Sequence, residues 1–171
     1  MRKETSDSMS EQTKPNTEAS ANAAPADGPL LNVEHLRVSY HTYAGEVQSV
    51  RDISFHVDRG EILAIIGESG CGKSVTARSI MSLIRKPGEI KEGSKITFDG
   101  RDVLSFSKKE MRQYRGGECG MIFQDALVAL DPTMRVGKQI MENLRIHTNM
   151  SKSEAAKEAA RLHGAVGIPH P

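Results

Sequence analysis

The chain has 171 residues, enough for one domain with its own hydrophobic core, and its length gives no support for two domains. Its 23 basic and 22 acidic residues leave a formal charge of +1, so no net field would recruit nucleic acid, and we expect no nucleic-acid partner. Because no apolar run approaches the roughly 18 residues of a membrane-spanning helix, and no secretory signal is visible, we expect a cytosolic chain.

The first part of the chain contains three kinds of segment, which differ in residue composition and pattern. Residues 1–28 are rich in Ser, Thr, Glu, Ala, Asn and Pro and almost lack large aliphatic residues, which predicts a disordered tail. Residues 30–40 and 47–57 form two strand-like runs with a turn at 43–46 between them, which predicts an antiparallel pair. The continuous apolar run at 62–66 predicts a strand that is covered on both faces at the centre of a sheet.

Shorter elements follow that run. Their spacing and punctuation predict, in chain order, a helix at 75–84, a strand at 96–98 with a turn at 99–100, a polar helix at 107–115, a short strand at 121–123, and amphipathic helices at 136–147 and 151–164. Ser107 is the expected N-cap of the polar helix, and Ser151 with Glu154 forms the expected capping box of the last helix.

The segment from Gly67 to Ser74 has the pattern G-x-x-x-x-G-K-S, which is typical of a loop that wraps the phosphates of a nucleoside triphosphate. Glycines let the backbone curl around phosphate oxygens, and the following helix presents its unpaired N–H groups to the same anion. We expect Lys73 to reach the β- and γ-phosphates of ATP and the Ser74 hydroxyl to ligate Mg²⁺. A chance match is the alternative, and the predicted strand before the motif and helix after it argue against that.

The two cysteines, Cys71 and Cys119, lie far apart and lack metal-ligand spacing, which fits a reducing compartment and excludes a disulfide scaffold. Cys71 lies just before a predicted helix N-terminus, where a thiolate would be stabilised, so a thiol reagent could compete with ATP there. The motif favours the simpler interpretation of a tolerated small residue, because nothing in the pattern requires sulfur.

Four segments together resemble the ATP-binding subunits of ABC transporters, and within them the peptide importers of the oligopeptide and dipeptide permease type. They are L-L-N-V-E-H-L-R-V-S-Y at 30–40, G-E-S-G-C-G-K-S at 67–74, M-I-F-Q-D at 121–125 and L-D-P-T-M-R-V-G-K-Q-I at 130–140. The resemblance implies an α/β fold, the P-loop NTPase core of an ABC ATPase with an antiparallel β subdomain. It makes residues 29–171 the N-terminal part of the ATP-binding domain, up to the start of the helical subdomain.

The resemblance also implies residue roles. Tyr40 matches the aromatic residue that stacks on adenine, and Gln124 matches the catalytic glutamine that reaches Mg²⁺ and the attacking water while contacting the membrane subunits. A partly buried strand tyrosine and a polar residue at a strand end are the respective alternatives. The residues expected at the nucleotide are Tyr40, Gly67, Glu68, Ser69, Gly70, Cys71, Gly72, Lys73, Ser74 and Val75, with Ser74 and Gln124 at the metal.

The sequence departs from the family pattern at several places. Ala126 and Ala129 stand where the family usually has proline and serine, which puts the coupling surface in doubt. The sequence has no L-S-G-G-Q signature, no apolar strand that ends in Asp-Glu and no switch histidine, so we expect a domain that is incomplete at its C-terminus. We therefore expect ATP binding with little or no hydrolysis.

The same resemblance implies where the chain works and with what. It implies a peripheral location on the cytoplasmic side of the cell membrane, transmembrane permease subunits as partners, and a second ATP-binding subunit packed head to tail. A truncated fragment without transport activity is the alternative. A third interpretation is a non-transport NTPase with Asp131 as its Mg²⁺ ligand; Pro132 after it favours a loop or helix-start role for Asp131 instead.

Overall fold

The computed structural model describes residues 28–124 and 129–168, so the tail predicted at 1–28 lies outside the described residues apart from Gly28. The strands are β1 (Leu31–Thr42), β2 (Gly45–Val57), β3 (Gly88–Ile90), β4 (Lys95–Phe98) and β5 (Arg101–Asp102). The helices are α1 (Lys73–Ile80), α2 (Lys108–Gln113), α3 (Val136–His147) and α4 (Lys152–Ala165), with a 3-10 turn η1 (Val103–Ser105) and a π-type turn η2 (Tyr114–Glu118). None of the helices in the two described ranges is both long and apolar enough to cross a bilayer.

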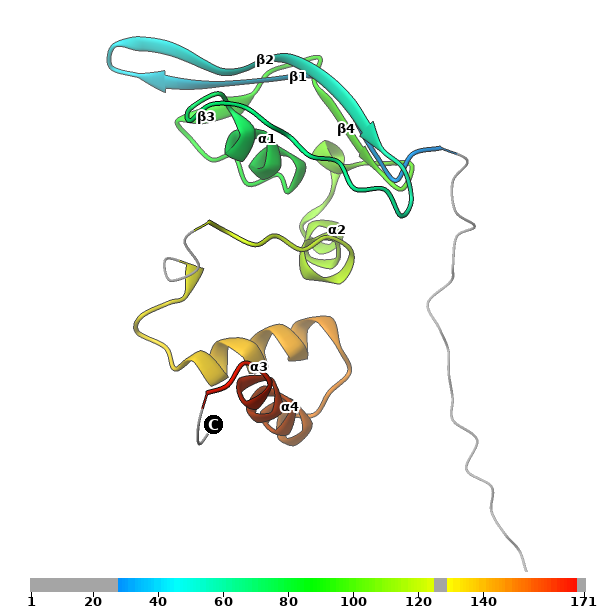
Figure 1. Cartoon of the computed structure of the whole chain (residues 1–171), viewed down its shortest axis with the longest axis vertical. Helices are drawn as coiled ribbons and strands as arrows, with labels where there is room; N and C mark the ends of the chain where they lie inside the picture. Colours follow the sequence, from blue (N-terminus) through cyan, green and yellow to red (C-terminus); the bar gives the residue numbers. More distant parts are fainter. Residues whose placement is uncertain (1–27, 125–128, 169–171) are drawn as a thin grey trace, which may run out of the picture.

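The antiparallel pair predicted near the N-terminus is confirmed as a long hairpin (Figure 1). β1 and β2 pair from Leu31 opposite Val57 to Thr42 opposite Gly45. The other edge of β1 pairs with β4 near its start and with β3 near its end, and β5 extends the sheet beyond β4. β1 is therefore the central strand of the sheet.

The main core lies between this sheet and the elements packed beneath it (Figure 1). β1 contributes Val33, Leu36 and Val38, all fully buried, as apolar side chains that the strand presents to the core. The remaining buried members are Val50, Met81, Ile96, Val103 and Tyr114. Burial of such side chains, worth about 1.5–3 kcal/mol each, holds α1 and η2 against the sheet.

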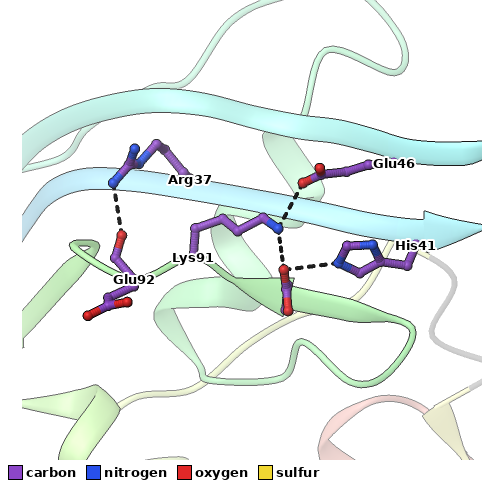
Figure 2. A network of polar contacts seen from close by, with 6 residues as sticks. Arg37, His41, Glu46, Lys91 and Glu92 are labelled. Carbon is purple, nitrogen blue, oxygen red and sulfur yellow. Dashed lines mark hydrogen bonds and ion pairs between the residues drawn. The ribbon is translucent and has the colours of Figure 1, made fainter.

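An ion-pair network joins the tip of the hairpin to β3 (Figure 2). The Lys91 ammonium donates to the carboxylates of Glu46, at 2.8 Å, and Glu89. His41 Nε2 lies 2.9 Å from the same Glu89 carboxylate. His41, Glu46 and Glu89 bring three possible metal ligands together, but the Lys91 ammonium already pairs with both carboxylates, so the cluster is an ion-pair network.

The helix caps predicted from the sequence are confirmed. Ser107 and Ser151 cap α2 and α4, and each accepts a hydrogen bond from the backbone of Glu110 or Glu154, whose carboxylates bond back to the serine N–H groups. α3 has the predicted bounds and packs against α4, where Ala155 and Ala159 are buried. The two helices form a hairpin at the opposite end of the molecule from the sheet (Figure 1).

Two predicted strands are wrong. Residues 62–66 and 121–123 have no regular secondary structure, and the side chains of Ile62, Ile66 and Ile122 are 94%, 92% and 95% exposed. A central parallel strand needs neighbours on both edges and layers on both faces. Within residues 28–124 and 129–168 no strand pairs with either run, so the apolar pattern lacks the partners that would make it a strand.

Candidate functional site

The segment Gly67–Gly72 forms a tight loop that leads directly into α1. Gly70 and Gly72 have φ angles of 81° and 98°, in the left-handed region that side chains disfavour. The Lys73 ammonium folds back over this loop and donates to the carbonyl oxygens of Gly67 at 2.7 Å and Glu68 at 2.6 Å. The sequence motif is thus a curled backbone with one cation held at its rim.

Close packing fixes the loop against β2. A Cβ atom at Gly72 would lie 2.5 Å from the carbonyl oxygen of Ser49, and one at Gly67 would lie 2.6 Å from Cys71 Sγ. Backbone atoms of Ser49 cannot move aside as a flexible side chain could, so only glycine fits at Gly72. Glycine is therefore needed at Gly72 for space as well as for conformation.

The helix begins two residues earlier and ends four residues earlier than its predicted range of 75–84. Thr76 N–H and its hydroxyl both donate to the Gly72 carbonyl, at 2.8 and 3.1 Å, which sets the first turn. The Val75 side chain is partly buried and packs against the core. Ser74 occupies the first turn with an exposed side chain, the position predicted for a metal-binding hydroxyl.

A cavity of about 420 Å³ lies between the loop and β2. Its cationic lining residues are Lys73 and Arg51, and no carboxylate side chain from the described part of the chain lines it. That charge balance suits a polyphosphate, whose oxygens need positive partners. Arg51 was not predicted from the sequence, and its position on β2 next to the loop becomes apparent only from the fold.

Tyr40 and Gln124 lie apart from this cavity. Tyr40 is half-buried near the end of β1, with its ring over Gly88, where a Cβ atom would lie 2.6 Å from Cε1. Gln124 is exposed and immediately precedes residues 125–128. That segment, which includes Ala126, lies outside the described residues. Of the residues predicted at the nucleotide, those from Gly70 to Lys73 line this cavity. Tyr40 and Gln124 do not line it.

Cys71 and Asp131 have local roles in the structure. The exposed Cys71 thiol lies 3.6 Å from the Lys73 ammonium. The Asp131 carboxylate accepts hydrogen bonds from the Thr133 hydroxyl and backbone N–H, at 2.6 and 2.8 Å, which lower its pKa. A carboxylate engaged in its own turn supports the loop role of Asp131 over a metal site.

Known proteins share both the sequence and the fold of this chain. Residues 50–170 match the family model described as ABC transporter. The chain belongs to the ABC transporter family. Solved structures support the fold: the dimeric ATP-binding cassette MJ0796 bound to ADP and Pi superposes with a TM-score of 0.64 at 20% identity, over 77% of this chain and 54% of that one. The predicted fold class, an ABC ATPase core with an antiparallel β subdomain, is confirmed.

Two curated relatives are named as ATP-binding proteins of peptide transport. The chain is 54% identical over 143 residues to the oligopeptide transport ATP-binding protein OppD of Bacillus subtilis, covering 83% of this chain and 40% of the relative. It is 49% identical over 145 residues to the dipeptide transport ATP-binding protein DppD of Lactococcus lactis, covering 84% of this chain and 41% of the relative. The chain thus spans about two fifths of the length of these relatives.

Proposed function

We propose that this chain binds Mg-ATP through the loop Gly67–Ser74 as the nucleotide-binding part of a peptide importer's ATP-binding subunit. The observation that carries the proposal is the curled loop with the Lys73 ammonium at its rim and α1 starting at the same residue. A helix start offers unpaired N–H groups and positive dipole charge to an anion. The loop and the helix start therefore offer an anion both backbone N–H groups and the Lys73 ammonium.

Each group has a separate task. The loop and first-turn amides hold the phosphate oxygens, and Lys73 turns from the Gly67 and Glu68 carbonyls to the terminal phosphates. Ser74 would supply a hydroxyl ligand to Mg²⁺, an ion that offsets phosphate charge when it is bound. Tyr40 provides an aromatic face for adenine, and Gln124 a neutral amide for the metal and the attacking water.

The proposed cargo and partners rest on the relatives. Peptide transport is named for both OppD and DppD, so we propose peptides as the solute and membrane-embedded permease subunits as partners. A second ATP-binding subunit, packed head to tail, would complete the nucleotide site, with the pair on the cytoplasmic face of the membrane.

Titration calorimetry with Mg-ATP tests the proposal. The wild-type chain is expected to bind, and Lys73→Ala to weaken binding at least about 10-fold, because a charge-assisted contact to phosphate is lost. Ser74→Ala should weaken Mg-ATP binding while leaving the metal-free affinity for ATP nearly unchanged. Lys109→Ala, which removes an exposed lysine of α2, is the matched control and should bind like the wild type.

Two results would contradict the proposal. The first is an absence of binding heat from wild-type chain that is folded by circular dichroism. The second is equal affinity for Lys73→Ala and Lys109→Ala, which would remove the loop from the binding site.

A further inference from the structure

α1 has a well-defined C-terminal end that the phosphate-loop motif does not explain. Leu83 N–H donates to the Arg78 carbonyl and Ser82 N–H to the Ser79 carbonyl, both at 2.8 Å, and Ser82 has a φ of 51°. This paired pattern with a left-handed residue is the Schellman motif. The last backbone carbonyl groups of a helix have no hydrogen-bond partner within the helix. The carbonyl groups of residues 80–82 therefore need donors from elsewhere in the chain.

Two consecutive side chains of η2 supply those partners. The Tyr114 hydroxyl donates to the Ile80 carbonyl at 3.0 Å, and Arg115 donates from Nε to Met81 at 2.8 Å and from its terminal nitrogen to Ser82 at 2.5 Å. Arg115 also places a cation at the negative end of the helix dipole. Three successive backbone carbonyl groups at the end of α1 thus accept hydrogen bonds from side chains 33 or 34 positions away in the sequence.

Tyr114 is itself rigidly held. Its side chain is fully buried and makes edge-to-face contacts with Phe98 and Phe106, at ring separations of 5.1 and 5.6 Å. Such aromatic pairs add about 0.5–1.5 kcal/mol beyond burial. A displacement of α1 would therefore displace η2, because the buried and packed Tyr114 ring cannot follow by simple rotation.

The chain then continues from this clamp, formed by Tyr114 and Arg115, toward Gln124. Cys119 N–H donates to the Tyr114 carbonyl at 2.8 Å, and Gly116 N–H donates to the Cys119 carbonyl at 2.9 Å. These bonds tie the start of segment 119–124 to η2. α1, about 12 Å long from its eight residues, thus has the phosphate loop at one end and the clamp at the other.

We propose that Tyr114 and Arg115 are positioning residues that couple the phosphate loop to segment 119–124. The proposal rests on the proposed function, since it requires a polyphosphate at the N-terminus of α1. A ligand that shifts α1 changes the exposure of segment 119–124 through the clamp. By thermodynamic reciprocity, a change in the state of segment 119–124 changes the affinity for that ligand. The sequence motifs assign no role to either residue.

Hydrogen exchange with and without saturating Mg-ATP, on the full chain, tests the coupling. In the wild type, Mg-ATP should slow exchange in residues 67–74 and alter it in residues 119–124. Arg115→Met should weaken Mg-ATP affinity about 5–10-fold, the lower range of typical coupling, and abolish the response at 119–124 while 67–74 stay protected. Arg112→Met, at an exposed arginine of α2, should behave like the wild type.

Two milder variants separate coupling from folding. Tyr114→Phe keeps the ring packing and removes only the bond to Ile80, and Arg115→Lys keeps a cationic donor that should restore part of the response. Binding without any response at 119–124 in the wild type, or an intact response in both Arg115→Met and Tyr114→Phe, would overturn the coupling alone. No binding of Mg-ATP to the wild type would instead overturn the proposed function, and the coupling with it.

Discussion

Two glycines of the phosphate loop differ in what they require. Gly70 has a φ of 81°, and outside its own residue and its two chain neighbours no atom lies within 4 Å of the position that a Cβ atom would take. Only backbone conformation therefore excludes other residues there. Gly72 has a φ of 98°, and a Cβ atom there would also lie 2.5 Å from the Ser49 carbonyl oxygen. Backbone conformation alone therefore requires glycine at position 70, whereas conformation and lack of space both require it at position 72.

We expect Gly70→Ala to destabilise the chain by about 1 kcal/mol, the cost of a left-handed alanine. Gly72→Ala should cost about 2–4 kcal/mol, because overpacking against the β2 backbone adds to the same strain. Urea denaturation followed by circular dichroism measures both values. Equal destabilisation by the two substitutions would show that the contact between the loop and β2 is not as tight as described.

The network of Lys91, Glu46, Glu89 and His41 acts at the scale of elements, because it connects the β1–β2 hairpin tip with β3 and the segment after it (Figure 2). Hydrogen bonding to Lys91, followed by that to His41, lowers the pKa of Glu89 to about 2. The same lysine lowers the pKa of Glu46 and has its own pKa raised by the two carboxylates. The network therefore stabilises the fold only while its carboxylates are ionised.

The pH dependence of this contribution follows from the depressed pKa of Glu89. The unfolded chain protonates this carboxylate near its ordinary value of 4.5 and the folded chain near 2, so stability is fully present above pH 4.5 and is lost as the pH falls toward 2. Wild type should melt at a higher temperature than Glu89→Gln at pH 6, and the difference should vanish near pH 2. Glu92→Gln, on the same segment, is the control, and a similar pH-dependent difference there would rule out the network as the cause.

At the scale of the whole molecule, the described residues expose large aliphatic side chains in two unpaired runs. Ile62 and Ile66 precede the phosphate loop, and Ile122 precedes Gln124; their exposed fractions are 94%, 92% and 95%. Scattered exposed aliphatics are ordinary, but contiguous ones next to unpaired backbone favour association with other chains. We therefore expect these runs to affect solubility more than folding stability.

Replacing both Ile62 and Ile66 by alanine should lower binding of a hydrophobic dye and slow aggregation, while changing unfolding free energy by less than about 0.5 kcal/mol. Ile96→Ala is the matched control, because that isoleucine is fully buried in the core and its truncation should cost about 2–5 kcal/mol. Dye fluorescence, light scattering and chemical denaturation measure the three quantities. A loss of several kcal/mol in the double variant would mean that residues 62–66 are packed in solution.

Sequence alone determined the features that depend on residues a few positions apart. The glycine loop, the serine caps of α2 and α4, the bounds of α3 and the β1–β2 hairpin were all predictable, because turns, caps and amphipathic periods are local. The family followed from the motifs and was confirmed by comparison. The roles of Tyr40 and Gln124 remain predictions.

Only the tertiary structure decided features that depend on distant partners. An apolar run such as 62–66 becomes a strand only where other strands can pair with it, and its own residues cannot reveal whether they do. The end of α1 at Ile80 is likewise supported by Tyr114 and Arg115, and the position of Arg51 beside the loop by the path of β2. Contacts across tens of residues are set by how the elements pack, which no local pattern encodes.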